Sequence, residues 1–441
     1  MTAPAFSADV FQNEYLPEGG REVNAIVTVT ATGAAVGPVA ASGTDAAEVI
    51  IIDTSGSMNY PPTKIRAAKQ ATSAAIDTLR DGVLFAVVAG SHEARQIYPR
   101  AGLVPADHTT RAQAKVAVST MQPDGGTAIG QWLLAAHRLF GAHPSAIKHA
   151  IVLTDGRNQH ETPEELARVL AATRGAFTAD CRGVGTDWEV AELRRVATAL
   201  LGTVDIVAEP AELADDFRAM TVQSMGKQVA EVALRLWTPQ GATVRFVKQV
   251  APDMLDLTDR RVETGPRSAD YPTGSWGSES RDYHVCVEVP AASVGEKMLA
   301  GRVSMVVPGS SDAVLAQGRM LAVWTDDEGL STRINKEVAH YTGQGELAQA
   351  IQDGLAARKA GDVETATAKL GRAVALAARM GNEDTAKLLA KVVEVEDPVT
   401  GTVRLRSRVA SVDEMTLDTR STKTARVKRA PGADPGSEGT A

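Results

Sequence analysis

The chain has 441 residues, with 46 Lys and Arg against 54 Asp and Glu, so its formal net charge is −8. This mild acidity argues against a dedicated nucleic-acid binder, which needs a basic surface. No apolar run approaches the ~20 residues that a membrane-spanning helix needs. The N-terminus lacks the basic and apolar regions of a signal peptide, so we expect none.

The cysteine content limits the kinds of stabilising site. Cys181 and Cys286 are too few for a disulfide framework or a zinc site of the paired-cysteine type. We expect two buried thiols in a reducing compartment, and therefore a cytoplasmic protein. None of these features determines the oligomeric state.

The first 46 residues are predicted to form β-strands. Val23, Ala25, Val27 and Val29 recur at every second position, which is the period of a strand. Residues 17–20 predict a turn, and the small, glycine-containing stretch 36–44 predicts a linker.

Between residues 47 and 225 short apolar runs alternate with segments of helical periodicity. Strands are predicted at 49–52, 84–88, 150–153, 177–184 and 204–207. Helices are predicted at 64–80, 110–121, 128–140, 163–174, 188–201 and 211–225. Nearly uniform apolarity is typical of parallel strands buried on both faces. The alternation predicts a doubly wound, Rossmann-like α/β domain.

Residues 226–328 return to a period of two and are interrupted by turns, as at 239–241 and 272–274. This pattern predicts an antiparallel β-sandwich. The set of strands is incomplete by itself, and we expect residues 1–46 to complete it. The α/β domain would then be an insertion into the sandwich.

The C-terminal part is predicted to be helical over residues 329–398. Glycine-containing pairs at 361–362 and 381–382 divide it into three helices, which form a plain hairpin or resemble one tetratricopeptide unit. Residues 399–441 are expected to contain a short strand at 402–409 and a disordered basic tail from about residue 420. The basic residues of the tail are Arg420, Lys423, Arg426, Lys428 and Arg429. Two interpretations of them remain open: a solvated tail, or a docking segment for an acidic partner.

The strongest chemical signal follows the first predicted strand of the α/β domain. Asp53, Ser55 and Ser57 are spaced two residues apart in a loop that leaves this strand. A carboxylate with two hydroxyls and no sulfur or imidazole suits Mg²⁺, which prefers oxygen ligands. Taken alone, these residues fit helix capping equally well.

Two further loops carry matching groups. Thr127 follows two glycines and precedes a predicted helix, and Asp155 follows a predicted buried strand. The loops at the carboxyl ends of parallel strands form the binding crevice of a doubly wound sheet. Three loops that deliver five oxygen ligands to one crevice favour a metal site over capping.

These residues resemble the von Willebrand factor A family. The D-x-S-x-S pattern of Asp53, Ser55 and Ser57, the Gly-Gly-Thr ending at Thr127 and the Thr-Asp-Gly around Asp155 match its metal-ion-dependent adhesion site. The resemblance covers roughly residues 47–225. It implies that the five residues bind Mg²⁺ (or Mn²⁺) and that an acidic group of a protein partner completes the shell. With its flanking parts, the chain resembles bacterial, actinobacterial-type proteins of this family, which implies a context of Ser/Thr kinases and forkhead-associated domains.

The residues beside these loops are candidates for partner recognition. Tyr60, next to Pro61 and Pro62, offers a rigid aromatic surface, and Arg157 and His160 follow Asp155. We expect Arg157 to pair with a second carboxylate of the partner. The simpler alternative is that Arg157 and His160 cap or solvate the helix that follows.

We therefore expect a non-enzymatic adaptor that binds a Glu or Asp of a protein partner through the metal. The chain has no G-x-x-x-x-G-K-[ST] phosphate loop. The rival hypothesis is an accessory subunit of a chelatase- or ATPase-type assembly, in which another subunit would hydrolyse ATP. A third hypothesis makes the metal purely structural.

Overall fold

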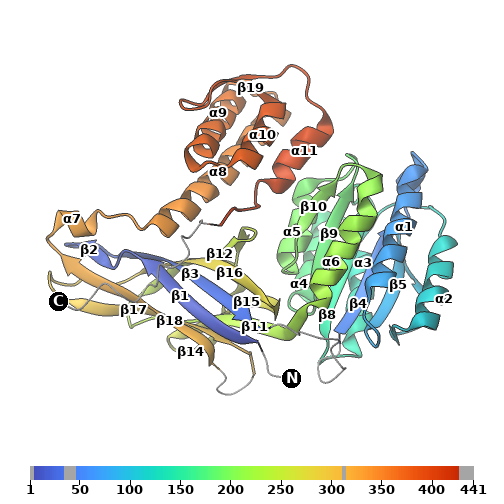
Figure 1. The fold of residues 1–441 in the computed structure, drawn as a ribbon, viewed down its shortest axis with the longest axis horizontal. Coiled ribbons are helices and arrows are strands. Elements are labelled where there is room, and N and C mark those ends of the chain that lie inside the picture. The colour runs from blue at the N-terminus through green and yellow to red at the C-terminus, as the bar shows by residue number, and fades with distance from the viewer. Residues whose placement is uncertain (1–3, 34–45, 310–313, 427–441) are drawn as a thin grey trace.

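The computed structural model describes residues 4–33, 46–309 and 314–426 (Figure 1). It contains an α/β domain, a β-sandwich and a C-terminal helical region. The linker predicted at 36–44 lies outside the described residues. Among the described helices, none combines the length and apolarity needed to cross a membrane.

The α/β domain is built on a seven-stranded sheet in the order β10-β9-β8-β4-β5-β6, with β7 also paired to β5. Its parallel strands are β4 (Ala46–Asp53), β5 (Leu84–Gly90), β8 (Ile147–Thr154), β9 (Thr178–Val184) and β10 (Val204–Val207). Two strands that were not predicted, β6 (Ala94–Tyr98) and β7 (Val104–Pro105), pair antiparallel to β5. They are short and only partly buried, so they lack a strong apolar pattern.

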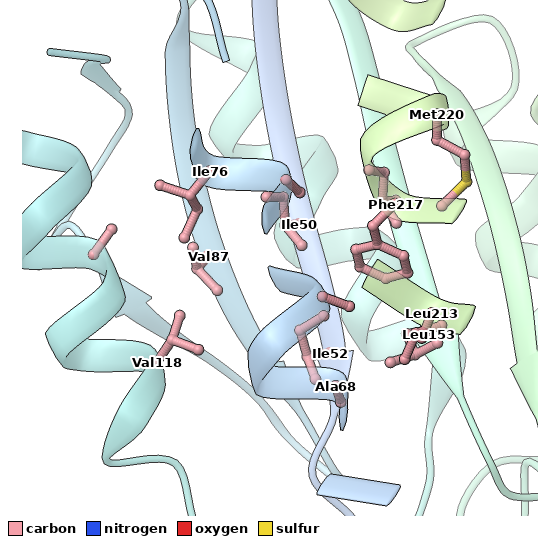
Figure 2. Close-up of a cluster of buried hydrophobic side chains, with 14 of the residues drawn as sticks. Ile50, Ile52, Ala68, Ile76, Val87, Val118, Leu153, Leu213, Phe217 and Met220 are labelled. Carbon is pink, nitrogen blue, oxygen red and sulfur yellow. The ribbon is translucent and has the colours of Figure 1, made fainter. Parts of the chain in front are cut away.

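Helices cover both faces of this sheet, as predicted. They are α1 (Thr63–Thr78), α2 (His108–Ser119), α3 (Ile129–Gly141), α4 (Pro163–Thr173), α5 (Val190–Ala199) and α6 (Leu213–Met225). On β4, Ile50 and Ile52 pack in a cluster with residues of α1 and α6 (Figure 2). Val49 and Ile51, which point the other way, pack in a second cluster with residues of α3, α4 and α5. Burial on both faces explains why β4 is apolar along its whole central part.

The β-sandwich consists of two sheets. One has the order β1-β3-β16-β12-β13: β1 (Ala5–Gln12), β3 (Glu22–Thr32), β16 (Glu279–Glu288), β12 (Thr243–Ala251) and β13 (Leu255–Asp256). The other has the order β14-β15-β11-β17-β18-β2: β14 (Val262–Gly265), β15 (Ser268–Gly277), β11 (Lys227–Trp237), β17 (Lys297–Val306), β18 (Val314–Thr325) and β2 (Tyr15–Pro17). A shared core that includes Trp276 and Trp324 joins them.

The N-terminal strands complete the sandwich. β3 lies between β1 and β16, and Val27 pairs with Tyr283 in the antiparallel ladder of β3 and β16. The α/β domain occupies the chain between β3 and β11, so the predicted insertion into a β-sandwich is confirmed. The sandwich is antiparallel as predicted except at β2, which pairs parallel to β18.

The C-terminal region begins with the short α7 (Glu328–Ser331) and three longer helices, as predicted. These are α8 (Lys336–Lys359), α9 (Val363–Met380) and α10 (Glu383–Val392). Asp362 caps α9 by accepting a hydrogen bond from the Thr365 amide (3.0 Å). Gly381 ends α9 with φ of 64°, a left-handed conformation that glycine adopts without strain.

The chain after α10 differs from the prediction. The predicted strand at 402–409 is shorter, β20 (Thr402–Leu405), and it pairs with β19 (Val393–Asp397), which was not expected. A further helix, α11 (Ser411–Arg420), was also missed. Its buried residues are few and include Thr416 and Thr419, so its apolar pattern is weak.

The expectation of a disordered tail from Arg420 is wrong for residues 420–426. Arg420 and Lys423 both pair with Asp205 of β10, and Arg426 pairs with Asp282 of β16 (3.4 Å). The Met254 amide donates to the Thr422 carbonyl (2.9 Å). This basic segment therefore docks on acidic residues of its own chain. Lys428 and Arg429 lie outside the described residues.

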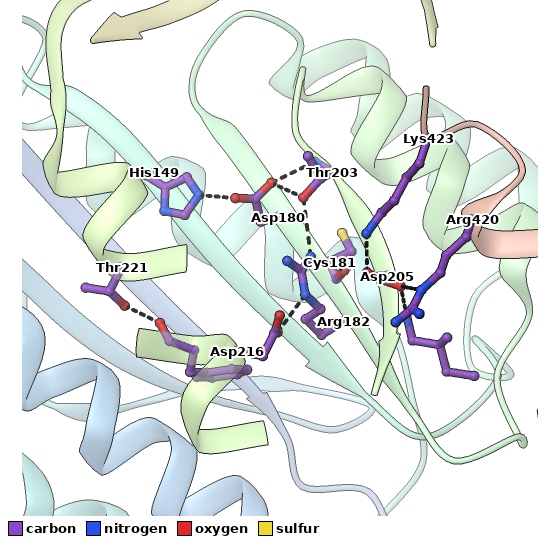
Figure 3. A network of polar contacts seen from close by, with 12 residues as sticks. His149, Asp180, Cys181, Arg182, Thr203, Asp205, Asp216, Thr221, Arg420 and Lys423 are labelled. Carbon is purple, nitrogen blue, oxygen red and sulfur yellow. Dashed lines mark hydrogen bonds and ion pairs between the residues drawn. The ribbon is translucent and has the colours of Figure 1, made fainter. Parts of the chain in front are cut away.

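A buried network of charges connects the amino-terminal halves of the parallel strands (Figure 3). His149 of β8 lies between Glu48 of β4 (2.7 Å) and Asp180 of β9 (3.1 Å). Arg182 donates to Asp216 (2.7 Å) in the same network. Burial by itself lowers the pKa of His149, but the charge of Glu48 and hydrogen bonds to both carboxylates outweigh it and raise this pKa from 6.5 to about 10.

We predict that His149→Gln destabilises β8 and β9 by roughly 3–5 kcal/mol, because glutamine leaves two buried carboxylates without the cation between them. Folding raises the pKa of His149, so its charged form stabilises the folded state. This contribution to the free energy of unfolding is complete below pH 6.5 and is lost as the pH rises toward 10. Hydrogen–deuterium exchange of β8 and β9 across this range measures both effects. The exposed His108→Gln is the control, and an unchanged pH profile in His149→Gln would contradict the prediction.

A second prediction concerns the discontinuous sandwich. A variant that lacks residues 1–32 should lose protease resistance in residues 227–325, because β16 becomes an unpaired edge and the core loses apolar side chains of β3. The α/β domain should keep its resistance, since its two cores contain no residue of β1 or β3. Limited trypsinolysis with peptide mapping is the measurement. Equal resistance of residues 227–325 in both proteins would disprove this dependence.

Candidate metal centre

The parallel pairing of β4 and β8 brings two distant carboxylates to one edge of the sheet. Ile52 pairs with Leu153, so Asp53, at the end of β4, and Asp155, just after β8, lie at neighbouring strand ends. Both side chains are fully buried. The carboxyl edge of this sheet is where a doubly wound fold places its ligands.

The three predicted hydroxyl residues lie at the same point. Ser55 Oγ is 2.9 Å from Ser57 Oγ, and Ser57 Oγ donates to Asp155 Oδ1 (2.7 Å). A Cβ atom placed on Gly156 would lie 3.3 Å from both Ser57 Oγ and Thr127 Oγ1. The structure therefore brings together all five residues predicted as metal ligands.

Hydrogen bonds between the loops hold this arrangement. The Gly56 amide donates to the Gly125 carbonyl (2.9 Å), which joins the first loop to the loop of Thr127. Asn158 Oδ1 accepts from the Ile129 amide (3.0 Å), so the loop after β8 caps the start of α3. These hydrogen bonds restrict the loops, which lowers the entropic cost of ordering them around a ligand.

Asp53 is a buried carboxylate that accepts hydrogen bonds from neutral groups. Its oxygens accept from the Ser55 amide (2.7 Å) and the Thr154 hydroxyl (2.5 Å). Burial raises its pKa from 3.8 to about 6; these hydrogen bonds oppose the shift and the charge of Asp155 adds to it. No ion pair reaches Asp53 among the residues that the structure describes. A cation at this point would stabilise the charged carboxylate.

Asp155, in contrast, has a cationic neighbour that the sequence analysis missed. Lys64 Nζ, in the first turn of α1, donates to Asp155 Oδ2 (2.7 Å) and to Asp187 Oδ2 (3.3 Å). Burial by itself lowers the pKa of Lys64, but the bond and charge of Asp155, with help from Asp187, outweigh it and raise this pKa.

The donor set fits a hard divalent cation. Two carboxylates and three hydroxyls offer only oxygen, which suits Mg²⁺ or Mn²⁺ better than a thiophilic metal. Within the described ranges no cluster of three or more His, Cys, Asp or Glu side chains is placed to hold a metal. Cys181 and Cys286 are buried free thiols, and burial raises the pKa of Cys286 to about 12, so neither is a ready thiolate ligand.

The three rim residues have different surroundings. Tyr60 is 74% exposed. Arg157 pairs with Glu189 (3.1 Å), which also pairs with Lys359 at the end of α8 (3.5 Å). Glu189 thus joins the α/β domain to the C-terminal region.

His160 lies over the glycines of the second loop. Its amide donates to the Thr127 carbonyl (3.0 Å), and its ring lies 6.0 Å from that of His92. A Cβ on Gly126 would lie 1.8 Å from His160 Cε1, so a larger residue there would push the exposed His160 ring aside. The backbone of His160 therefore helps to hold the loop of Thr127, while its ring is exposed.

Sequence reasoning missed Lys64, His92, Glu189 and Lys359 at this site. Lys64 offered one signal: a lysine in the first turn of a helix opposes the helix dipole and needs a local reason. His92 follows Gly90 at the end of β5, an edge where ligands are expected. Lys359 had no such signal, because only the tertiary fold brings it to Glu189.

Comparisons with known proteins agree with this architecture. Two family models match, the von Willebrand factor type A domain over residues 47–206 and the von Willebrand factor type A C-terminal domain over residues 375–421. A solved structure of a von Willebrand factor type A protein from Catenulispora acidiphila is 55% identical, covers 96% of this chain and 98% of its own, and has a TM-score of 0.91. No protein with a curated description matches significantly.

Two more distant structures also match. The ArnB paralog VWA2 from Sulfolobus acidocaldarius is 15% identical, covers 95% of this chain and 98% of its own, and has a TM-score of 0.58, which shows a shared fold alone. Proximal thread matrix protein 1 from the mussel byssus, solved with its metal site occupied by zinc, is 24% identical over 40% of this chain and 46% of its own, with a TM-score of 0.34. Its zinc is a property of the mussel protein.

Proposed function

Because the chain belongs to the von Willebrand factor type A family, we propose that it is a binding protein that holds a protein partner through a divalent cation. Domains of this family commonly mediate protein interactions through such a site. The observation that supports the proposal most is the convergence of Asp53, Ser55, Ser57, Thr127 and Asp155 on loops that are hydrogen-bonded to one another.

The five candidate ligand residues differ in the charge that they contribute. Asp53 and Asp155 supply the negative charge, and the three hydroxyls supply neutral oxygens that complete part of the shell. A bound Mg²⁺ or Mn²⁺ would supply an electrophilic position that a carboxylate can fill. The Ser57 hydroxyl donates to Asp155, but both residues belong to the five that would hold the cation, and we propose that the protein acts by binding and not by catalysis.

The rim favours an acidic partner. Arg157 and Lys359 are 58% and 78% exposed, and they share the single carboxylate of Glu189. Exposed ion pairs contribute ~0–1 kcal/mol, so a partner carboxylate can replace Glu189 at little cost. Tyr60 adds an exposed aromatic surface of the kind that forms interface hot spots.

The cellular setting remains a prediction. The role beside Ser/Thr kinases and forkhead-associated domains is implied by the family resemblance, and the cytoplasmic location is expected from the two unpaired cysteines. The accessory role in a chelatase- or ATPase-type assembly predicts that ligand variants lose stimulation of a partner ATPase.

Our first prediction for the site concerns the metal. Asp53→Asn and Asp155→Asn should each lower Mg²⁺ affinity at least tenfold, because each removes a charge and keeps a hydrogen-bonding group. Ser57→Ala should have a smaller effect, since water can replace one neutral ligand. Isothermal titration calorimetry with Mg²⁺ is the measurement.

The control for these variants is Asp77→Asn, which changes an exposed carboxylate of α1 that pairs with Lys115. It should bind Mg²⁺ like the wild type. Circular dichroism should show unchanged folding in all of them. Wild-type affinity in both Asp53→Asn and Asp155→Asn would disprove the assignment of the site.

The second prediction concerns the rim. Tyr60→Ala and Arg157→Ala should each weaken partner binding by roughly 1–3 kcal/mol without changing Mg²⁺ affinity. A partner is first identified as a protein that the wild type captures with Mg²⁺ but not with EDTA, and that Asp53→Asn does not capture. Titrations of that partner against both variants then measure the losses. Unchanged partner affinity in both variants would restrict the contact to the metal itself.

A further inference from the structure

Lys64 is a buried cation placed against one of the five ligand residues. Its side chain is 8% exposed, and its ammonium donates to Asp155 Oδ2 at 2.7 Å. The other oxygen of Asp155 accepts from Ser57 Oγ (2.7 Å) and faces the hydroxyl cluster. One carboxylate therefore connects Lys64 to the candidate metal centre.

This placement is unfavourable by local rules. Lys64 is the second residue of α1, where the positive end of the helix dipole favours acidic side chains. Burial of an ammonium costs free energy unless a partner charge compensates it. The compensating charge is that of Asp155, so the placement of Lys64 is linked to the candidate metal centre and not to the stability of the helix.

Lys64 also changes the net charge of the candidate metal centre. Asp53 and Asp155 carry two negative charges and Lys64 carries one positive charge, so the buried group has a single negative charge. Asp187, the other partner of Lys64, is 70% exposed, and water screens its charge. With a divalent cation bound, the same side chains leave one positive charge in excess. An anion from outside can neutralise it.

We propose that Lys64 is a positioning and charge-setting residue that weakens the binding of the cation alone and strengthens the binding of a carboxylate to the loaded site. The inference rests on the proposed function. Lys64 would make the binding of the cation and the binding of the acidic partner depend on each other. Thermodynamic linkage requires that each ligand then changes the affinity for the other by the same factor. The partner group that this balance selects is a single anionic side chain.

The test is the neutral variant Lys64→Met, which keeps much of the length of the side chain. Removal of one nearby positive charge should raise Mg²⁺ affinity about tenfold or more, as expected for opposite charges that shift a carboxylate pKa by ~1–3 units. Calorimetry with Mg²⁺ in chloride buffer measures the change. The rise in thermal midpoint on addition of Mg²⁺ should also be larger than in the wild type.

The anion is tested with acetate, which presents the same carboxylate as an acidic side chain. Replacement of chloride by acetate at equal ionic strength should raise the apparent Mg²⁺ affinity of the wild type, and raise it less in Lys64→Met. Lys64→Arg keeps the charge and should behave like the wild type. Lys69→Met, a lysine of α1 that donates to the Ser119 carbonyl (2.9 Å), is the matched control and should change nothing.

The outcomes separate this inference from the proposed function. If wild type fails to bind Mg²⁺, both are overturned. If wild type binds Mg²⁺ but Lys64→Met binds it equally or more weakly, Lys64 merely orients Asp155, and only this inference is overturned. Acetate that strengthens Mg²⁺ binding equally in both proteins would likewise overturn the role of Lys64 and leave the proposed function standing.

Discussion

The parallel pairing of β4 with β8 is the constraint on which the candidate site depends. It sets the ends of two largely buried strands side by side, so that Asp53 and Asp155 lie close together although about a hundred residues separate them along the chain. Burial of both strands on both faces fixes their register, because a one-residue slip would turn apolar side chains away from their own core. The loops can then be short and well hydrogen-bonded, and the hydroxyls of Ser57 and Thr127 need no flexibility to reach the same point.

The two ends of this sheet differ in how completely their buried carboxylates are paired with cations. At the amino-terminal half, Glu48, His149 and Asp180 form a chain in which each acid has a cationic neighbour. At the carboxyl end, Asp53 has none among the described residues, and burial raises its pKa. Since the same fold pairs buried charges at one end, the unpaired carboxylate at the other is a local property of the site. At this carboxyl end of the sheet, an external cation would add most to the stability of the charged Asp53 carboxylate.

Patterns that repeat along the chain could be interpreted from the sequence, and contacts that join distant segments could not. The apolar runs of β4 and β8 and the loops of Asp53, Thr127 and Asp155 were predictable, because each strand pattern and each motif is local. The insertion into the sandwich followed from counting strands on the two sides of the α/β domain. Lys64 was not recognised, since its position in the first turn of a helix is a weak signal and its bond to Asp155 spans distant parts of the chain. Helix α11 and the docking of Arg420 and Lys423 on Asp205 depend on tertiary contacts that short periodic patterns do not reveal.

The C-terminal region belongs to the surroundings of the site and is not merely appended to it. Arg194 of α5 pairs with Asp418 of α11 (2.8 Å), and Arg358 of α8 pairs with Glu414 of α11 (2.6 Å), so α11 connects α8 to the α/β domain. That connection places Lys359 beside Glu189, the residue that also holds Arg157. The candidate metal ligands come from the α/β domain alone, whereas the pair around Glu189 combines cations from two parts of the chain. Under the proposed function, selection of a partner would therefore change through the helical region while the chemistry of the candidate metal centre stays the same.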